Sequence, residues 1–207
     1  MELNIRNQEN KEFFDEKAKG YDEVHMPFMS TKNLLTESID IIPNNVVDLG
    51  AGTGLELIEF FKKYPDSRVK AIDLSEGMLD ELRKRDFVDK VDIICGDFFS
   101  IDFGEGIDVV MSTSALHHFL YNEKMKLYKK IYDSLRNGGL FINSDYTANS
   151  EEEEKQCIYN YEHKVNRHND TPLSLDHELE ILKHVGFKEI DIKQPEKPSY
   201  KLIKARK

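Results

Sequence analysis

The sequence predicts an α/β fold built on a central, mostly parallel sheet. Short apolar runs that end in polar residues alternate with longer segments in which apolar residues recur at helical spacing. The most informative unit begins with the apolar run Val46–Leu49, continues with glycines at 50, 52 and 54, and ends in a helical pattern over 55–64. A strand, glycine turn and helix in this order expose backbone N–H groups to an anionic ligand group.

The remaining elements follow from periodicity, caps and breakers. Strands are expected at 69–73, 91–95, 107–111, 140–144, 190–193 and 200–205. Residues 21–28 read as a loop. Helices are expected from the start to near Gly20, from Ser30 or Thr31 to before Pro43, after the N-cap Ser75, at 122–136, from 150 to about Arg167, and from 174 to the stop at Gly186.

The composition of the chain limits the classes of protein to which it can belong. The chain has 207 residues with 29 basic and 39 acidic side chains, and its formal net charge of −10 repels a nucleic-acid backbone. No apolar run is long enough to span a bilayer, and the N-terminus lacks a secretory pattern. Cys95 and Cys157 belong to no metal-ligand pattern. These features predict a cytoplasmic protein with no metal site and no nucleic-acid or membrane partner.

The spacing of the glycine turn separates two classes of nucleotide site. A dinucleotide fingerprint, G-x-G-x-x-G, expects glycine or alanine where Leu55 stands. Asp48, Gly50, Gly52 and Gly54 instead fill every fixed position of E/D-x-G-x-G-x-G, so the stretch resembles the first motif of class I S-adenosyl-L-methionine-dependent methyltransferases. The resemblance implies a three-layer, Rossmann-like fold with sheet order 3-2-1-4-5-7-6 and strand 7 antiparallel. A tight turn without a ligand is the alternative.

The predicted cofactor site extends beyond the turn. Asp73 ends the second strand, where a carboxylate can accept both ribose hydroxyls of an adenosine; a solvated strand-end charge is the alternative. The resemblance implies that Asp97 bonds the adenine amine, that the Phe98 N–H meets a ring nitrogen and that the Thr113 carbonyl faces the methionine amine. The full expected set is Asp48, Gly50, Ala51, Gly52, Gly54, Asp73, Leu74, Met78, Asp97, Phe98 and Thr113.

Two residues are candidates for catalysis. The run 112–119, with Ala-Leu-His-His, resembles the family segment after strand four, and an imidazole titrates near neutral pH, so His117 is a candidate base. Asp145 stands at the carboxyl end of the fifth strand, the ligand edge of such a sheet. A base is needed only when the acceptor must lose a proton, because a sulfonium already activates its methyl group. The alternative is that this His pair packs locally, without a catalytic role.

Two additions to the bare fold are expected to roof an acceptor pocket. We divide a single domain, 1–207, into an N-terminal helical preface or lid (1–43), a cofactor-binding half (44–149), an inserted helix (150–173) and a C-terminal helix and hairpin (174–207). A dimer contact is the competing interpretation of the inserted helix. Candidate acceptor contacts are Tyr21, His25, Tyr159, Glu162 and His163.

The function implied by the resemblance is transfer of a methyl group from S-adenosyl-L-methionine to a small-molecule acceptor, by an enzyme that is a monomer or homodimer. Positioning and exclusion of water would supply most of the acceleration. A protein that holds S-adenosylmethionine or S-adenosylhomocysteine without turnover would have the same motifs. A nicotinamide-dependent oxidoreductase is a further alternative, which Leu55 disfavours.

Overall fold

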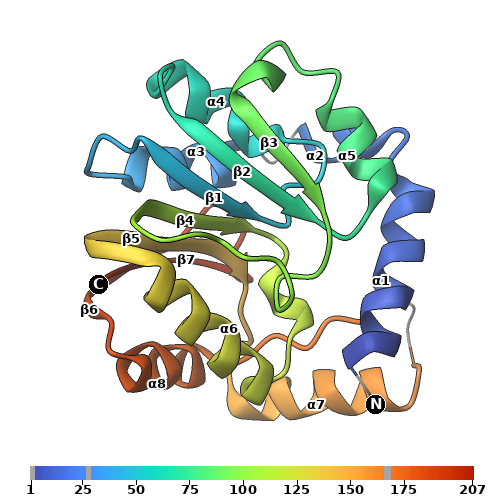
Figure 1. The fold of residues 1–207 in the computed structure, drawn as a ribbon. Helices are drawn as coiled ribbons and strands as arrows, with labels where there is room; N and C mark the ends of the chain where they lie inside the picture. The colour runs from blue at the N-terminus through green and yellow to red at the C-terminus, as the bar shows by residue number, and fades with distance from the viewer. Residues whose placement is uncertain (1–2, 27–28, 166–168) are drawn as a thin grey trace.

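The computed structural model describes residues 3–26, 29–165 and 169–207. Seven strands in this part of the chain form one sheet of order β3-β2-β1-β4-β5-β7-β6, which confirms the predicted order (Figure 1). β7 runs antiparallel to β5 and β6, and the other pairs are parallel. The strands are β1 (Asn45–Leu49), β2 (Arg68–Asp73), β3 (Val91–Cys95), β4 (Ile107–Thr113), β5 (Leu135–Tyr146), β6 (Lys188–Lys193) and β7 (Tyr200–Arg206).

Helices cover both faces of the sheet. α3 (Met29–Ser38), α4 (Leu55–Lys63) and α5 (Glu76–Leu82) pack on one face, and α6 (Tyr121–Ser134) and α8 (Leu175–Val185) pack on the other. Because successive strand side chains point to opposite faces, neighbouring residues of β1 enter different cores. Among the described helices, none combines the length and apolar character that crossing a bilayer would need.

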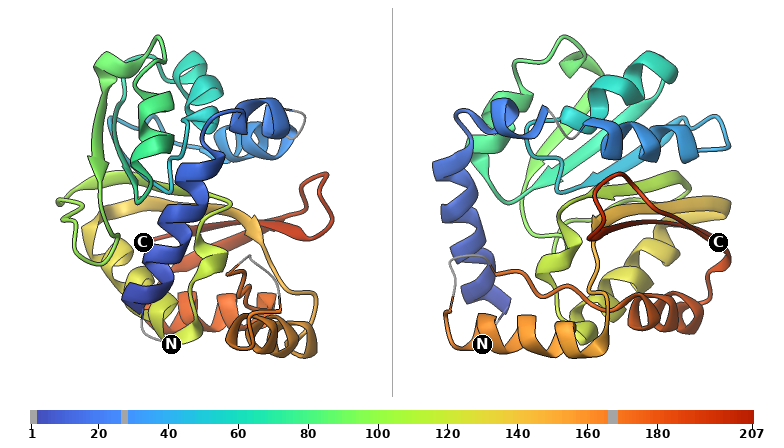
Figure 2. Two further views of the ribbon diagram at one scale, coloured as in Figure 1. Left: turned by 90° about the vertical axis from the view of Figure 1, so that its right-hand side faces the viewer. Right: turned by 180° about the vertical axis from the view of Figure 1, so that it is seen from behind.

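Two further helices stand at the carboxyl edge of the parallel strands. α1 (Leu3–Lys17) runs along this edge from α5 to α7 (Glu151–Glu162), at the right of Figure 1. Figure 2, left, shows α1 crossing in front of the edge. The edge where ligands bind in open α/β sheets is therefore covered by the N-terminal preface.

Four predicted boundaries are wrong. α3, expected to continue to before Pro43, ends at Ser38, and the other three differences each have a local reason. Residues 21–25 form a short helix, α2 (Tyr21–His25), because Gly20 at φ 88° turns the chain into it; Pro27 and Phe28 lie outside the described residues. α7 ends at Glu162, since Lys164 takes a left-handed φ of 52°. The expected end near Arg167, with His168, also lies outside the described residues.

The last of these differences concerns the glycines after α6. The helix ends at Ser134, two residues before the expected end, because Leu135 is already extended and pairs with Ile107. The Gly138 N–H donates to the Lys207 carbonyl at 3.0 Å, so the glycine pair lies inside β5 and does not cap a helix. A Cβ at Gly139 would crowd the carbonyl oxygens of neighbouring backbone at 3.0–3.2 Å.

Candidate functional site

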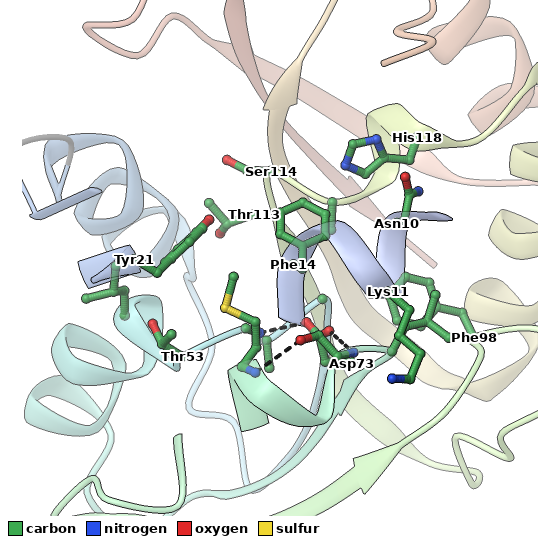
Figure 3. Close-up of a pocket in the computed structure, with 18 of the residues that line it drawn as sticks. Asn10, Lys11, Phe14, Tyr21, Thr53, Asp73, Phe98, Thr113, Ser114 and His118 are labelled. Carbon is green, nitrogen blue, oxygen red and sulfur yellow. Dashed lines mark hydrogen bonds between the residues drawn. The ribbon is translucent and has the colours of Figure 1, made fainter. Parts of the chain in front are cut away.

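A cavity lies between the carboxyl ends of β1, β2 and β4 and the helix α1. It encloses about 730 Å³, counted with its opening to solvent, which is in the range of small-molecule sites. Its wall comes from the glycine turn, Asp73–Ser75 and Thr113–Ala115, and its roof from α1 (Figure 3). The α1 residues that line it are Asn7, Asn10, Lys11 and Phe14.

Glycine is required at the three positions of the turn for different structural reasons. All have positive φ, at 78° for Gly50, 51° for Gly52 and 74° for Gly54. A Cβ at Gly50 would overlap the Ala115 side chain, and one at Gly54 would overlap Leu82. A Cβ at Gly52 would meet only a carbonyl oxygen at 4.0 Å. Gly52 is therefore the glycine whose backbone is open to a ligand.

Asp73 joins the turn to the next strand. Its Oδ2 accepts the Gly52 N–H and its Oδ1 accepts the Ser75 N–H, both at 2.8 Å. Burial raises the pKa of Asp73 to about 6, although these backbone bonds favour the ionised form. Each carboxylate oxygen can accept a further hydrogen bond, so Asp73 can hold a pair of ligand hydroxyls at the cavity wall.

A chain of buried acids lies beneath and beside the turn. Lys32 Nζ is 2.8 Å from Glu56 Oε2, and both residues line the cavity. Glu56 Oε1 and both oxygens of Asp48 have no partner among the described residues. Burial, with Glu56 nearby, raises the pKa of Asp48 well above its usual range. Asp48, a predicted cofactor residue, lies behind the turn and does not line the cavity.

His117 belongs to an ion-pair network. Its Nδ1 lies 2.6 Å from Asp145 Oδ1, and its Nε2 lies 3.2 Å from Asp170 Oδ1. Burial opposes the charge, but the Asp145 and Asp170 carboxylates raise the pKa of His117 to about 9. Asp145 Oδ2 also accepts the backbone N–H groups of Leu116 and His117. Neither His117 nor Asp145 lines the cavity, so this geometry does not support their predicted catalytic roles.

His118 is the histidine at the cavity wall. Its Nδ1 lies 3.2 Å from the Asn169 carbonyl oxygen, so that nitrogen donates, while Nε2 has no partner among the described residues. Burial, with the charge on His117 beside it, lowers the pKa of His118 to about 3. His118 is thus a neutral imidazole with an unused acceptor nitrogen. No sequence pattern favours His118 over His117.

The roof is attached to the wall through two carboxylates. Asp15 of α1 accepts the Ser75 hydroxyl at 2.6 Å and the Gly77 N–H at 3.0 Å. Asp22 of α2 accepts the Thr53 hydroxyl at 2.6 Å and pairs with Arg85 at 2.5 Å. These bonds join the preface to the starts of α4 and α5, which border the glycine turn.

The predicted acceptor contacts separate into two groups. Tyr21 lines the cavity and stacks on His25, with ring centroids 3.8 Å apart. Tyr159, Glu162 and His163 do not line it. Tyr159 and His163 stack on each other at the exposed surface of α7, with centroids 3.9 Å apart. The structure therefore brings only the first pair toward the site.

α7 supports the roof from behind. The Arg6 guanidinium lies 5.5 Å from the centroid of the Tyr161 ring, and Arg6 also pairs with Glu123. The Asn169 amide, in the loop after α7, donates to Asn10 Oδ1 at 2.9 Å. Because Asn10 lines the cavity, the inserted segment positions the roof without reaching the cavity itself.

Comparison with known proteins identifies the family. A family model described as a methyltransferase domain matches residues 46–139. A carboxy-S-adenosyl-L-methionine synthase of Nautilia profundicola is 31% identical, over 87% of this chain and 88% of that protein. The chain belongs to the class I S-adenosylmethionine-dependent methyltransferases. Its cofactor is therefore S-adenosylmethionine.

Three further similar proteins are matched over a smaller share of their own length. A malonyl-[acyl-carrier protein] O-methyltransferase of Priestia megaterium is 28% identical over 58% of this chain, but only 43% of that protein is matched. Human N-acetylserotonin methyltransferase, solved with S-adenosylmethionine, matches with a TM-score of 0.72 and 20% identity, over 94% of this chain and 55% of that one. An O-methyltransferase family protein of Burkholderia thailandensis has a TM-score of 0.73 and 17% identity, over 92% of this chain and 59% of that one. The likeness to these two structures shows the fold alone.

The candidate site contains residues that the sequence did not indicate. Lys32 and Glu56 meet across 24 positions, and Asn10 reaches the cavity from a helix with little apolar pattern. No local signal marks either contact. Of the remaining predicted cofactor residues, all line the cavity except Gly54 and Asp97. The Cα of Gly54 faces the Leu82 side chain. The Oδ1 of Asp97 accepts the Phe99 N–H at 3.2 Å.

Proposed function

We propose that the protein transfers the methyl group of S-adenosylmethionine to a small molecule that binds beside Thr113 and Ser114. The observation that supports this function most directly is the roofed cavity, in which Gly52 and Asp73 form an open, polar wall opposite α1. A roof formed by the chain's own helix favours an acceptor small enough to enter a closed site. The negative net charge of −10 argues against a nucleic-acid acceptor.

The residues present fit the cofactor. In this proposal Asp73 holds the ribose hydroxyls, and Leu74, Met78 and Phe98 contact the adenine ring. Asp97 does not line the cavity, and its side chain would have to turn from the Phe99 N–H to reach the adenine amine. The Glu56 carboxylate, which lines the cavity, suits the ammonium group of the methionine part, because the two groups carry opposite charges in a site with little water. The positive φ and open side of Gly52 let the cofactor approach the backbone.

The chain's own residues would contribute chiefly by positioning. When bound, S-adenosylmethionine supplies a methyl group activated by the sulfonium. Phe14 and Asn10 exclude water from above the cavity. His118, neutral because its pKa lies near 3, would accept a hydrogen bond at Nε2 from a proton-bearing acceptor. His117, protonated at neutral pH, can only donate.

Calorimetric titration of the purified protein tests the proposal. We expect S-adenosylmethionine and S-adenosylhomocysteine each to bind one site per chain and NAD to give no binding heat. Turnover is then followed as S-adenosylhomocysteine release with a panel of small hydroxy, amino and thiol compounds. Failure of both adenosyl ligands to bind would reject the function. Binding without release for any acceptor would instead favour the non-catalytic binding protein.

One relative suggests a second reaction on the same site. The Nautilia profundicola protein, aligned over 87% of this chain, is named for making carboxy-S-adenosyl-L-methionine. The nucleoside released from the purified protein on denaturation distinguishes the two candidates. We expect S-adenosylmethionine or S-adenosylhomocysteine by mass spectrometry. A nucleoside heavier by one carboxyl group would favour the second reaction.

A further inference from the structure

His118 is held at the cavity wall by a hydrogen bond to the loop that follows α7. Its Nδ1 lies 3.2 Å from the Asn169 carbonyl oxygen, whereas Asp170 Oδ1, at 3.6 Å, is beyond hydrogen-bond distance. A carbonyl oxygen only accepts, so Nδ1 carries the ring hydrogen and Nε2 is the accepting nitrogen. Nε2 is buried and has no partner among the described residues. The bond to Asn169 therefore determines which ring nitrogen the cavity can use.

The side chain of Asn169 is bound to the roof. The residue is buried, and its amide nitrogen donates to Asn10 Oδ1 at 2.9 Å and to Glu9 Oε2 at 3.3 Å, both on α1. On the wall side, the Thr171 N–H donates to the His117 carbonyl at 2.8 Å, which fixes the loop two residues further along the chain. Asn169 therefore faces the wall with its main chain and the roof with its side chain.

The same helix also contacts the imidazole ring of His118. Phe14 stands one turn after Asn10 on α1, so the two side chains share one face of the helix. The Phe14 ring meets the His118 ring edge-on, with centroids 5.8 Å apart. Asn10, Phe14 and His118 all line the cavity (Figure 3). The roof thus touches the imidazole directly through Phe14, and through Asn169 it restrains the nitrogen that faces away from the cavity.

We propose that Asn169 is a positioning residue that couples closure of the roof to the tautomer of His118. With α1 in place, the Asn169 carbonyl faces Nδ1 and the accepting Nε2 is left at the cavity. When α1 moves away, the Asn169 side chain loses its bonds to the helix and its main chain can turn. The Nε2–H tautomer, which an imidazole prefers in water, then becomes populated. The inference rests on the proposed function for its purpose: a proton-bearing acceptor would meet an accepting nitrogen only in the closed cavity, from which water is excluded.

The ring nitrogens of His118 report this coupling without any ligand. In protein made with isotope-labelled histidine, NMR spectra at neutral pH distinguish a protonated from a bare ring nitrogen, and His118→Gln assigns the signals. We expect a protonated Nδ1 and a bare Nε2 in the wild type. Asn169→Ala should lower the ratio of the Nδ1–H to the Nε2–H tautomer by about fivefold, the effect of one hydrogen bond. Asn10→Ala, which removes only the acceptor on α1, should shift the ratio in the same direction. Asn160→Ala, which removes an amide that bonds to Gln156 on α7, is the matched control and should leave it unchanged.

Each outcome decides the proposal. An unchanged ratio in Asn169→Ala would overturn it, and so would a ratio that responds to Asn169→Ala but not to Asn10→Ala, because the coupling would then not reach the roof. A general loss of structure is recognised at His117, whose two ring nitrogens should stay protonated in every variant because its carboxylate partners remain. Loss of that signal together with the tautomer shift would also overturn the proposal.

S-adenosylhomocysteine separates this inference from the proposed function. By stabilising the closed roof, the nucleoside should restore the Nδ1–H tautomer in Asn10→Ala. If it binds and the ratio does not rise, closure does not control the tautomer and the coupling is wrong. If it does not bind, the proposed function is rejected, while the comparison of the ligand-free variants still decides whether Asn169 sets the tautomer.

Discussion

The wall and the roof of the cavity are held by different forces. The wall is the edge of a seven-stranded sheet, so Gly52, Asp73 and Thr113 are fixed by backbone hydrogen bonds and by two packed cores. The roof consists of α1 and the short helix α2, which reach the wall mainly through Asp15 and Asp22. The contact of α2 with the wall rests on the partly exposed Asp22, so breaking it costs less free energy than opening the wall. A ligand can therefore enter the cavity when the roof opens.

Burial separates the ion pair behind the wall from the pair that joins α2 to the wall, whereas the Arg6 side chain of α1 is itself buried in its pair with Glu123. The His117 and Asp145 side chains behind the wall are 9% and 2% exposed, whereas those of Arg85 and Asp22 at the roof are 21% and 37% exposed. Pairs near the surface contribute about 0.2–1 kcal/mol, but removing one partner of a buried pair costs roughly 3–5 kcal/mol. The wall network should therefore dominate stability, and the Asp22–Arg85 pair should dominate access.

The largest effect is expected from Asp145→Asn. The change leaves the buried His117 without its main counter-charge, so the free energy of unfolding should fall by roughly 3–5 kcal/mol in urea denaturation. Asp133→Asn, at an exposed pair with Lys129, is the matched control and should change it by less than about 0.5 kcal/mol. Similar small losses in both variants would contradict the contrast between wall and surface.

The pH dependence of stability sharpens the same test. The folded pKa of His117, about 9, lies above its ordinary value of 6.5. The stabilisation from protonated His117 is therefore fully present below pH 6.5 and is lost as the pH rises through 9. We expect wild-type stability to fall across this window and the Asp145→Asn variant to show a weaker fall.

The next largest effect concerns the wall's contact with the cofactor. Asp73→Ala should weaken S-adenosylmethionine binding by about 1–3 kcal/mol, because hydroxyl partners lose their acceptor. Calorimetry measures this affinity, and the melting temperature checks that the variant is folded. Asp92→Ala, an exposed acid on the neighbouring strand β3, serves as the control with unchanged affinity. Unchanged affinity in folded Asp73→Ala would remove Asp73 from the site.

Asp73 should also make cofactor binding depend on pH. Its pKa is about 6 in the free protein, and ribose hydroxyls would donate to the ionised carboxylate, so binding favours deprotonation. Affinity should rise with pH through about 6 and level off above it, by at most about tenfold per pH unit below the pKa. Calorimetry between pH 5 and 8 tests this, with Asp73→Ala as the reference. A steeper dependence in the variant than in the wild type would exclude Asp73 as its source.

The wall was predictable from the sequence, because its signals are local. The glycine spacing, Asp73 at a strand end and Ser75 as an N-cap each lie within a few residues of the feature they predict, and the structure contains all three. The sheet order was implied by the family resemblance carried by this turn.

The division of roles between His117 and His118 was not predictable. The two residues are adjacent and share one motif, yet Asp145 approaches His117 from 28 positions away and Asp170 from further along the chain. Their pKa values separate to about 9 and about 3 only through these contacts and burial.

The smallest effect is expected at the roof. Asp22→Asn removes the ionic bond to Arg85 and weakens the bond to Thr53, so the open state should gain at most about 1 kcal/mol, or roughly fivefold in population. Trypsin can cut after Lys17 or Lys19, beside the exposed hinge Gly20. When opening is fast relative to cleavage, the cutting rate follows the open population. We therefore expect up to about fivefold faster cleavage in this variant.

Two comparisons make the roof experiment decisive. Asp80→Asn removes a more exposed acid that pairs with Arg83 on the outside of α5, and it should leave the cleavage rate unchanged. S-adenosylhomocysteine should slow cleavage in the wild type, because a ligand enclosed beneath α1 stabilises the closed state. Cleavage that ignores the ligand but slows as protein concentration rises would mean that the preface is protected by a second copy. The N-terminal helices would then lie in an interface between two copies of the chain, and they would not act as a lid.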